Sequence, residues 1–168
     1  MADTLRLTPR ETVTIRSVST ELLEVEGRWG PGGKPPPAHY HPDQDEYFEV
    51  LEGTLTAKVA GEQRELGPGE TLDIPQRTPH QIWNAGEVEA RAIWQTRPAG
   101  RTENWFRSID RLFSDGRVGK SGMPGPLAFG VYLTEYRDVF RLASPPDLVA
   151  RPLLAVLGLI GRARGYGT

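Results

Sequence analysis

The chain has 168 residues, of which 38% are hydrophobic and 25% are charged, and its formal net charge is −2. This composition is ordinary for a soluble globular domain, and without a basic run it gives no support for binding to nucleic acid or to an anionic membrane. There are no cysteines, so disulfides and thiolate metal sites are excluded, and any metal must be held by nitrogen and oxygen.

The sequence shows no targeting or membrane-spanning segment. The N-terminal residues lack the apolar stretch of a signal peptide. The longest apolar run, Leu153–Gly161, is far too short to cross a bilayer. We therefore expect a cytoplasmic protein with no membrane partner.

Up to about residue 98 the pattern predicts β-structure. Residues 12–18 and 54–60 alternate with period 2, as half-buried strands do. Other short segments rich in β-branched and aromatic residues are 21–29, 46–53, 71–75, 80–86 and 89–97. Turn residues separate these segments, as in Gly-Pro-Gly-Gly at 30–33 and Gly-Pro-Gly at 67–69. Many short strands at this spacing indicate an antiparallel sandwich or barrel.

After Pro98 the apolar residues follow helical spacing. A first helix is predicted with Thr102 as its N-cap and a stop at Gly116. Residues 116–126 are predicted to form a loop, and a second helix is predicted over residues 127–140. Ser144, followed by two prolines, predicts the N-cap of a last helix.

Pro152 is expected to split or restart that last helix. The chain thus divides into a β-barrel with N-terminal strands, residues 1–98, and a helical extension, residues 99–168. The extension is too small for an independent domain, and we expect it to pack on the barrel or on a partner subunit.

Three histidines and one glutamate are candidates for a metal site. His39 and His41 lie two residues apart after three prolines, a spacing that turns both side chains to one face of a strand. Glu46 opens the segment 46–53 on its less charged face, and His80 opens the segment 80–86. Three imidazoles and one carboxylate inside a barrel are typical ligands of a divalent transition metal.

Taken singly, each of these side chains is more often a solvated or structural residue than a ligand, and the full pattern decides between the two interpretations. The chain resembles the cupin superfamily, whose motifs are G-x5-H-x-H-x3,4-E-x6-G and G-x5-P-x-G-x2-H-x3-N. The matching residues are Gly33, His39, His41, Glu46 and Gly53, then Gly69, Pro75, His80 and Asn84. Arg77 stands where the second motif has glycine, so a turn there would need arginine in a left-handed conformation.

The resemblance implies a mainly β fold, the cupin double-stranded β-helix or jelly-roll barrel, over about residues 10–98. It also implies one divalent transition metal (Fe, Mn, Ni, Co, Cu or Zn) bound by His39, His41, Glu46 and His80. In similar metal-dependent cupins the glutamate also acts as a base, so Glu46 is the candidate catalytic residue. The ligand types do not identify the metal.

A small organic molecule is the expected ligand. Four protein ligands on an octahedral ion leave two positions for water, dioxygen or a chelating substrate. The residues considered for the pocket wall are Trp29, Tyr47, Phe48, Ile82, Trp83 and Trp94. Core packing is the alternative for each of them, and Trp83 should face away from the site.

The resemblance, together with the two open positions on the metal, implies a metal-dependent enzyme of dioxygenase type that acts on an enolic or phenolic substrate. The alternatives are a non-catalytic binding protein and an isomerase, lyase or cyclase on the same scaffold. A sensor domain of a regulator is disfavoured because no helix-turn-helix segment accompanies the barrel. We expect a homodimer, because sheet edges and the apolar run Leu153–Ile160 need cover.

Overall fold

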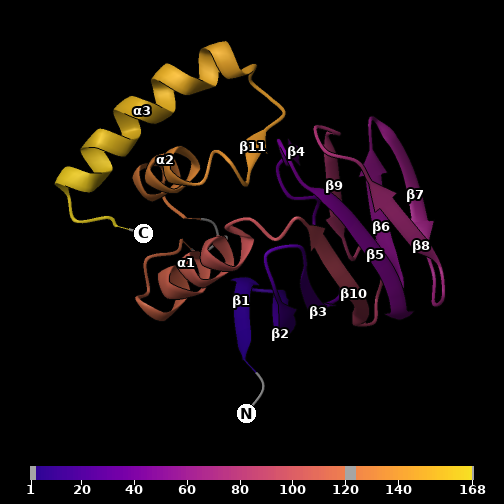
Figure 1. Ribbon diagram of the computed structural model, residues 1–168. Helices are drawn as coiled ribbons and strands as arrows, with labels where there is room; N and C mark the ends of the chain where they lie inside the picture. Colours follow the sequence, from indigo (N-terminus) through magenta and orange to yellow (C-terminus); the bar gives the residue numbers. More distant parts are fainter. Residues whose placement is uncertain (1–2, 120–123, 168) are drawn as a thin grey trace.

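The computed structural model describes residues 3–119 and 124–167 and is built from two antiparallel sheets and three helices within those ranges. The strands are β1 (Thr4–Thr8), β2 (Glu11–Val18), β3 (Leu23–Trp29), β4 (His39–Tyr40), β5 (Asp45–Glu52), β6 (Leu55–Val59), β7 (Glu62–Leu66), β8 (Thr71–Ile74), β9 (His80–Trp83), β10 (Ala90–Arg97) and β11 (Arg141–Leu142). One sheet has the order β1-β2-β3-β10-β5-β8 and the other β11-β4-β9-β6-β7. The predicted jelly-roll barrel with C-terminal helices is confirmed (Figure 1).

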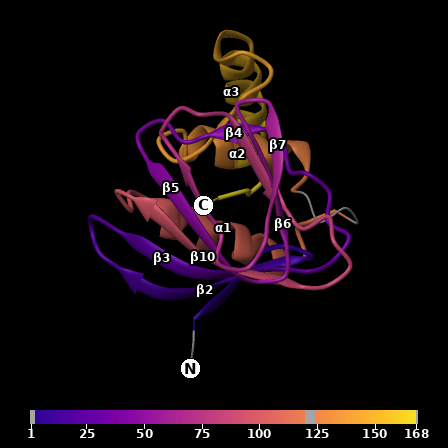
Figure 2. The ribbon, with the colours of Figure 1, turned by 90° about the vertical axis from the view of Figure 1, so that its right-hand side faces the viewer.

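Alternation along the strands sets the inside of the barrel. In β5, Glu46, Phe48 and Val50 are 3%, 2% and 1% exposed, so the predicted inward face is confirmed. The barrel core gathers between the two sheets, which enclose it in the view of Figure 2. β7 was not predicted, because its residues Glu62–Arg64 are polar and exposed and only Leu66 is buried.

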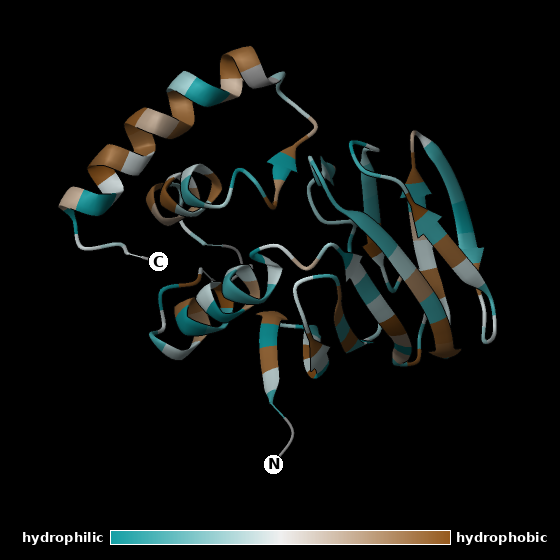
Figure 3. Cartoon of the chain, viewed as in Figure 1, coloured by the Kyte–Doolittle hydropathy of each residue, from teal (hydrophilic) through white to brown (hydrophobic). Residues whose placement is uncertain are grey.

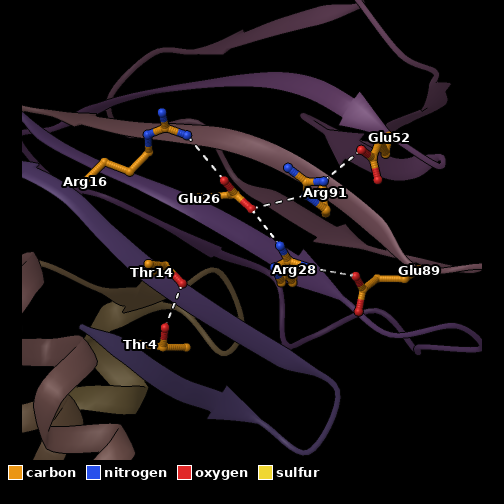
Figure 4. A network of polar contacts seen from close by, with 8 residues as sticks. All are labelled: Thr4, Thr14, Arg16, Glu26, Arg28, Glu52, Glu89 and Arg91. Atoms are coloured by element: carbon orange, nitrogen blue, oxygen red, sulfur yellow. Dashed lines mark hydrogen bonds and ion pairs between the residues drawn. The ribbon is translucent and has the colours of Figure 1, made fainter. Parts of the chain in front are cut away.

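The outward face of the larger sheet is charged. Glu26 on β3 lies 3.3 Å from Arg16 and 3.1 Å from both Arg28 and Arg91 (Figure 4). Exposed ion pairs of this kind contribute little to stability. They mark the solvent side of the sheet and leave its other face for the core.

The helices are α1 (Thr102–Ser114), α2 (Pro126–Glu135) and α3 (Asp147–Ala163), and they lie on one side of the barrel (Figure 1). The second helix is shorter than the predicted 127–140, since residues 136–140 turn away and lead into β11. The N-cap prediction for Thr102 is wrong. Thr102 is the first helical residue, and its hydroxyl accepts a hydrogen bond from Gln44 Nε2 at 2.8 Å.

The last helix also differs from the prediction at two points. The predicted cap at Ser144 is wrong, because Pro146 holds the N-cap position with an extended ψ of 148° and separates Ser144 from the helix. Pro152 neither splits nor restarts it, and α3 runs continuously through this proline. The carbonyl that lacks an N–H partner is that of Leu148, an exposed residue, so water can satisfy it.

Close backbone contact joins α3 to α2. A Cβ added at Gly130 would lie 2.6 Å from Leu157 Cβ, so only glycine allows this approach. The opposite side of α3 leaves apolar residues such as Leu148 and Leu159 exposed. Hydrophobic stretches, drawn in brown, recur along this helix in Figure 3. Within the described ranges, none of the helices has the length and apolar character that a transmembrane span requires.

Candidate metal centre

The structure brings together the four side chains that the sequence singled out. His39 lies in β4 and is paired directly with His80, the first residue of β9, while Glu46 comes from β5 in the facing sheet. His41 lies beyond the end of β4, so the expectation that both histidines share one strand is wrong for His41. Its ring nevertheless reaches the others, and the three ring centroids are 4.5 to 5.4 Å apart.

The nitrogens of the three rings are close enough together for a single ion, and Glu46 lies beside two of them. One nitrogen from each of the three rings lies within 4.8 Å of the others. Glu46 Oε2 lies 2.9 Å from His80 Nε2 and 3.3 Å from His41 Nε2. Two ligands at right angles, each about 2.1 Å from an ion, are about 3.0 Å apart.

Backbone carbonyls orient all three imidazoles. The Nδ1–H groups of His39, His41 and His80 donate to the carbonyl oxygens of Pro37, Val139 and Thr78 at 2.9, 2.6 and 2.9 Å. A carbonyl only accepts, so the proton of each neutral ring is on Nδ1 and the lone pair is on Nε2. Histidines that bind a metal through one ring nitrogen almost always donate a hydrogen bond from the other ring nitrogen in this way.

Two buried polar atoms at the centre, His41 Nε2 and Glu46 Oε2, have no hydrogen-bond partner among the described residues. Buried polar atoms without partners are rare in folded proteins. The other carboxylate oxygen, Oε1, accepts a hydrogen bond from Trp94 Nε1 at 2.8 Å. The residues present therefore fit a divalent ion, which would satisfy both unpaired atoms.

The ionisation of the site suits the same cation. Burial, with the charges of His80 and His41, lowers the pKa of His39 to about 3, which keeps this ring neutral. Burial alone would raise the pKa of Glu46, but its contacts with His41 and His80 outweigh burial and hold that pKa well below the usual range. An anionic oxygen thus lies among imidazole nitrogens.

The C-terminal extension contributes to the centre, which the sequence did not predict. The carbonyl that orients His41 belongs to Val139, 98 residues away. Phe140 stacks on the ring of His39, with centroids 4.4 Å apart and planes 18° apart, and Trp105 of α1 stacks on Phe140. β11 follows at once and pairs with β4. Helical spacing concealed these contacts, because it assigned Val139 and Phe140 to a helix.

The centre opens into a cavity of about 160 Å³ with mostly apolar walls. Of the predicted wall residues, Trp29, Phe48, Ile82 and Trp94 line it, whereas Tyr47 and Trp83 do not. The helical extension adds wall residues that were not predicted, Trp105, Phe106, Ile109, Phe129 and Phe140. A dry apolar cavity of about 150 Å³ holds one benzene ring, so this cavity matches a small aromatic or enolic molecule.

The other motif positions have structural roles. Asn84 is 1% exposed and donates from Nδ2 to the carbonyls of Trp29 and Val88, so it holds a turn. Arg77 adopts the left-handed conformation that its motif position requires, with φ of 63°. Its backbone N–H donates to His41 O at 2.7 Å and its Nε to Pro42 O at 3.0 Å. Arg77 therefore fastens the turn to the segment that carries His41.

Comparison with known proteins places the centre within a recognised domain. Residues 26–96 match the family model described as the cupin domain. The four side chains of the centre lie inside this match, and the helices lie outside it. The structure of KdgF from Halomonas sp. is similar with a TM-score of 0.55 over 60% of this chain and 92% of that chain. At 24% sequence identity, this likeness concerns the fold alone.

Two curated relatives are similar over part of their length. The tetracenomycin polyketide synthase protein TcmJ of Streptomyces glaucescens is 40% identical over 60 residues, which are 36% of this chain and 40% of that protein. The probable oxidoreductase yanE of Aspergillus niger is 34% identical over 98 residues, covering 50% of this chain and 38% of that protein. The chain thus spans about two fifths of each of these relatives.

Proposed function

Residues 26–96 of this chain belong to the cupin superfamily, and we propose that the chain is a divalent-metal-dependent enzyme acting on a small enolic or phenolic compound. Dioxygen addition is the reaction we expect. The observation that carries the proposal is the set of three imidazoles, each held at Nδ1 by a backbone carbonyl, and one carboxylate, all of which line an apolar cavity. The names of the relatives, a polyketide synthase protein and a probable oxidoreductase, agree with an organic substrate.

His39, His41, Glu46 and His80 would hold the ion. A divalent ion held there would supply Lewis-acid chemistry, which would stabilise the negative charge of an enolate or phenolate. The Trp94 N–H holds Glu46 Oε1 and leaves Oε2 directed at His41 and His80.

The cavity wall would position the organic part of the substrate. Phe48 and Trp94 stack on each other at 5.3 Å, and Trp94 also contacts Phe106 of α1. This wall would exclude water and hold a planar ring against the metal centre. Because α1 and the segment after α2 close the cavity, the helical extension belongs to the proposed active site.

Metal analysis and oxygen consumption test this function together. The purified protein should contain about one divalent metal per chain, and His80→Ala should lose it, because the change removes one Nε2 ligand. A panel of catechols, phenols and 1,3-diketones should include a compound that drives oxygen uptake by the wild type but not by His80→Ala.

Glu46→Gln tests the second role assigned to this residue. The amide oxygen can still face the metal but cannot take a proton, so retained metal with lost turnover would support Glu46 as a base. Ligand binding without any chemical change would instead favour the non-catalytic alternative. Conversion of a substrate without oxygen uptake would favour an isomerase, lyase or cyclase. A homodimer, a cytoplasmic location and the absence of nucleic-acid partners stay predictions.

A further inference from the structure

A second carboxylate lies in the same cavity as the metal centre. Glu11 begins β2, is half-buried, and shares its inward face with Val13, which is fully buried. Its cross-strand partner is Trp29 of β3, another inward residue. Glu11 and Glu46 are the carboxylates among the described residues that line the cavity. Acidic residues are rare at core-facing positions, because removing a carboxylate from water is unfavourable unless it is paired.

The charge of this carboxylate lacks a cationic partner. Among residues 3–119 and 124–167, no ion pair reaches Glu11. The buried indole N–H of Trp29 lies near enough to favour its charged form, but this N–H makes no well-aligned hydrogen bond to the described residues. Burial prevails and raises the pKa of Glu11 to about 7, with a further contribution from the charge of Glu46.

Glu11 also marks a junction between two cavities. An adjoining cavity of about 540 Å³ is lined in part by Arg10 and Lys34. Six residues line both this cavity and the one at the metal centre: Thr8, Glu11, Trp29, Pro36, Pro37 and Ile82. A molecule that reaches the histidines from the adjoining cavity would pass Glu11.

We propose that Glu11 is a catalytic acid–base residue that exchanges a proton with the substrate bound at the metal centre. The proposal rests on the proposed function. The proton passes from a substrate O–H to a carboxylate oxygen of Glu11, and the O–H electron pair stays on the substrate oxygen. The products of the step are the neutral acid and an enolate or phenolate facing the histidines.

Geometry favours Glu11 over Glu46 for this step. Glu46 Oε1 already accepts from Trp94, and Oε2 faces His41 and His80. Among the described residues, Glu11 makes no side-chain hydrogen bond beyond the contact with the nearby Trp29 indole N–H, and it borders the space where the organic part would lie. The titratable groups that share its two cavities are Glu46, His39, His41, His80, Arg10 and Lys34. A carboxyl group whose pKa lies near neutral pH exchanges protons most effectively at that pH.

Proton counting during ligand binding tests the proposal without turnover. Catechol is titrated calorimetrically into the zinc-loaded protein at pH 8, in two buffers of different ionisation enthalpy. The wild type should keep the catechol proton on Glu11, whereas Glu11→Gln should release about one more proton per bound catechol. The control is Glu24→Gln, a half-buried carboxylate on the outward face of β3, which should match the wild type.

Carboxyl carbon NMR identifies the group directly. One glutamate carboxyl should titrate near pH 7 in the wild type and in Glu24→Gln, and its signal should be absent from Glu11→Gln. Equal proton release by wild type and Glu11→Gln would overturn the proposal and leave the metal-dependent function standing. A difference in proton release with no oxygen uptake from any substrate would support Glu11 and refute the dioxygenase function.

Discussion

Replacement of Phe140 by leucine should weaken metal binding although Phe140 is not a ligand. The ring of Phe140 stacks on His39 and is held from behind by Trp105. Leucine keeps most of the apolar volume but removes the stacked face. His39 would then be held in place mainly by its hydrogen bond to Pro37, and its Nε2 would be less well aimed at the ion.

The size of the effect follows from the stack. An aromatic pair contributes about 0.5–1.5 kcal/mol beyond its buried area, and about 1.4 kcal/mol is a tenfold change in an equilibrium constant. The dissociation constant for Zn²⁺ should therefore rise about twofold to twelvefold. The other ligands keep their own contacts, so the number of bound metals per chain should not change.

Competition against a metallochromic chelator measures this change. The matched control is Phe113→Leu, because Phe113 is also half-buried in the helical extension and packs in the same apolar cluster, away from the histidines. Both variants should lose a similar free energy of unfolding, about 1 kcal/mol. Equal zinc affinities in the two variants would refute the idea that the Phe140 stack orients His39.

Three further predictions concern charge, assembly and domain organisation. Because the pKa of Glu11 is raised from 4.5 to about 7, its protonated form is favoured in the folded state, and wild-type stability should fall relative to Glu11→Gln as pH rises from 4.5 to 7. The change should approach about 3 kcal/mol in urea unfolding, and a constant difference between pH 4 and pH 8 would contradict the raised pKa. The apolar face of α3, on which Leu148 and Leu159 are 87% and 68% exposed, should pair two copies, so light scattering should give twice 18.6 kDa. Replacing both leucines with glutamate should halve that mass, and a monomeric wild type at micromolar concentration would rule the dimer out. A chain ending at Pro98 should lose most of its helical circular dichroism and also bind zinc more weakly, since the Val139 carbonyl no longer orients His41; undiminished zinc affinity would show that the barrel alone is sufficient.

Residue patterns along the chain were enough to predict an antiparallel sandwich or barrel, and the motif resemblance narrowed this to the jelly-roll and named the candidate central side chains. Period-2 alternation locates Glu46, Phe48 and Val50 on one inward face, because successive side chains on a strand point to opposite sides. The resemblance of the residues around them to the two cupin motifs groups His39, His41, Glu46 and His80 into one expected site, which their spacing alone does not do. Strands and short motifs can be predicted from a sequence because they depend on residues that are close together along the chain.

The surroundings of that centre follow only from the packing of distant segments. The Val139 carbonyl reaches His41 across 98 residues, and a backbone carbonyl leaves no trace in a residue pattern. Phe140 has the same apolar character in a helix as in the stack on His39, so its spacing did not reveal its partner. Glu11 stands outside both motifs, and its place in the cavity depends on how the twisted sheet folds over the histidines. Such contacts join segments that are remote along the chain, so they arise only when the two sheets and the helical extension pack together.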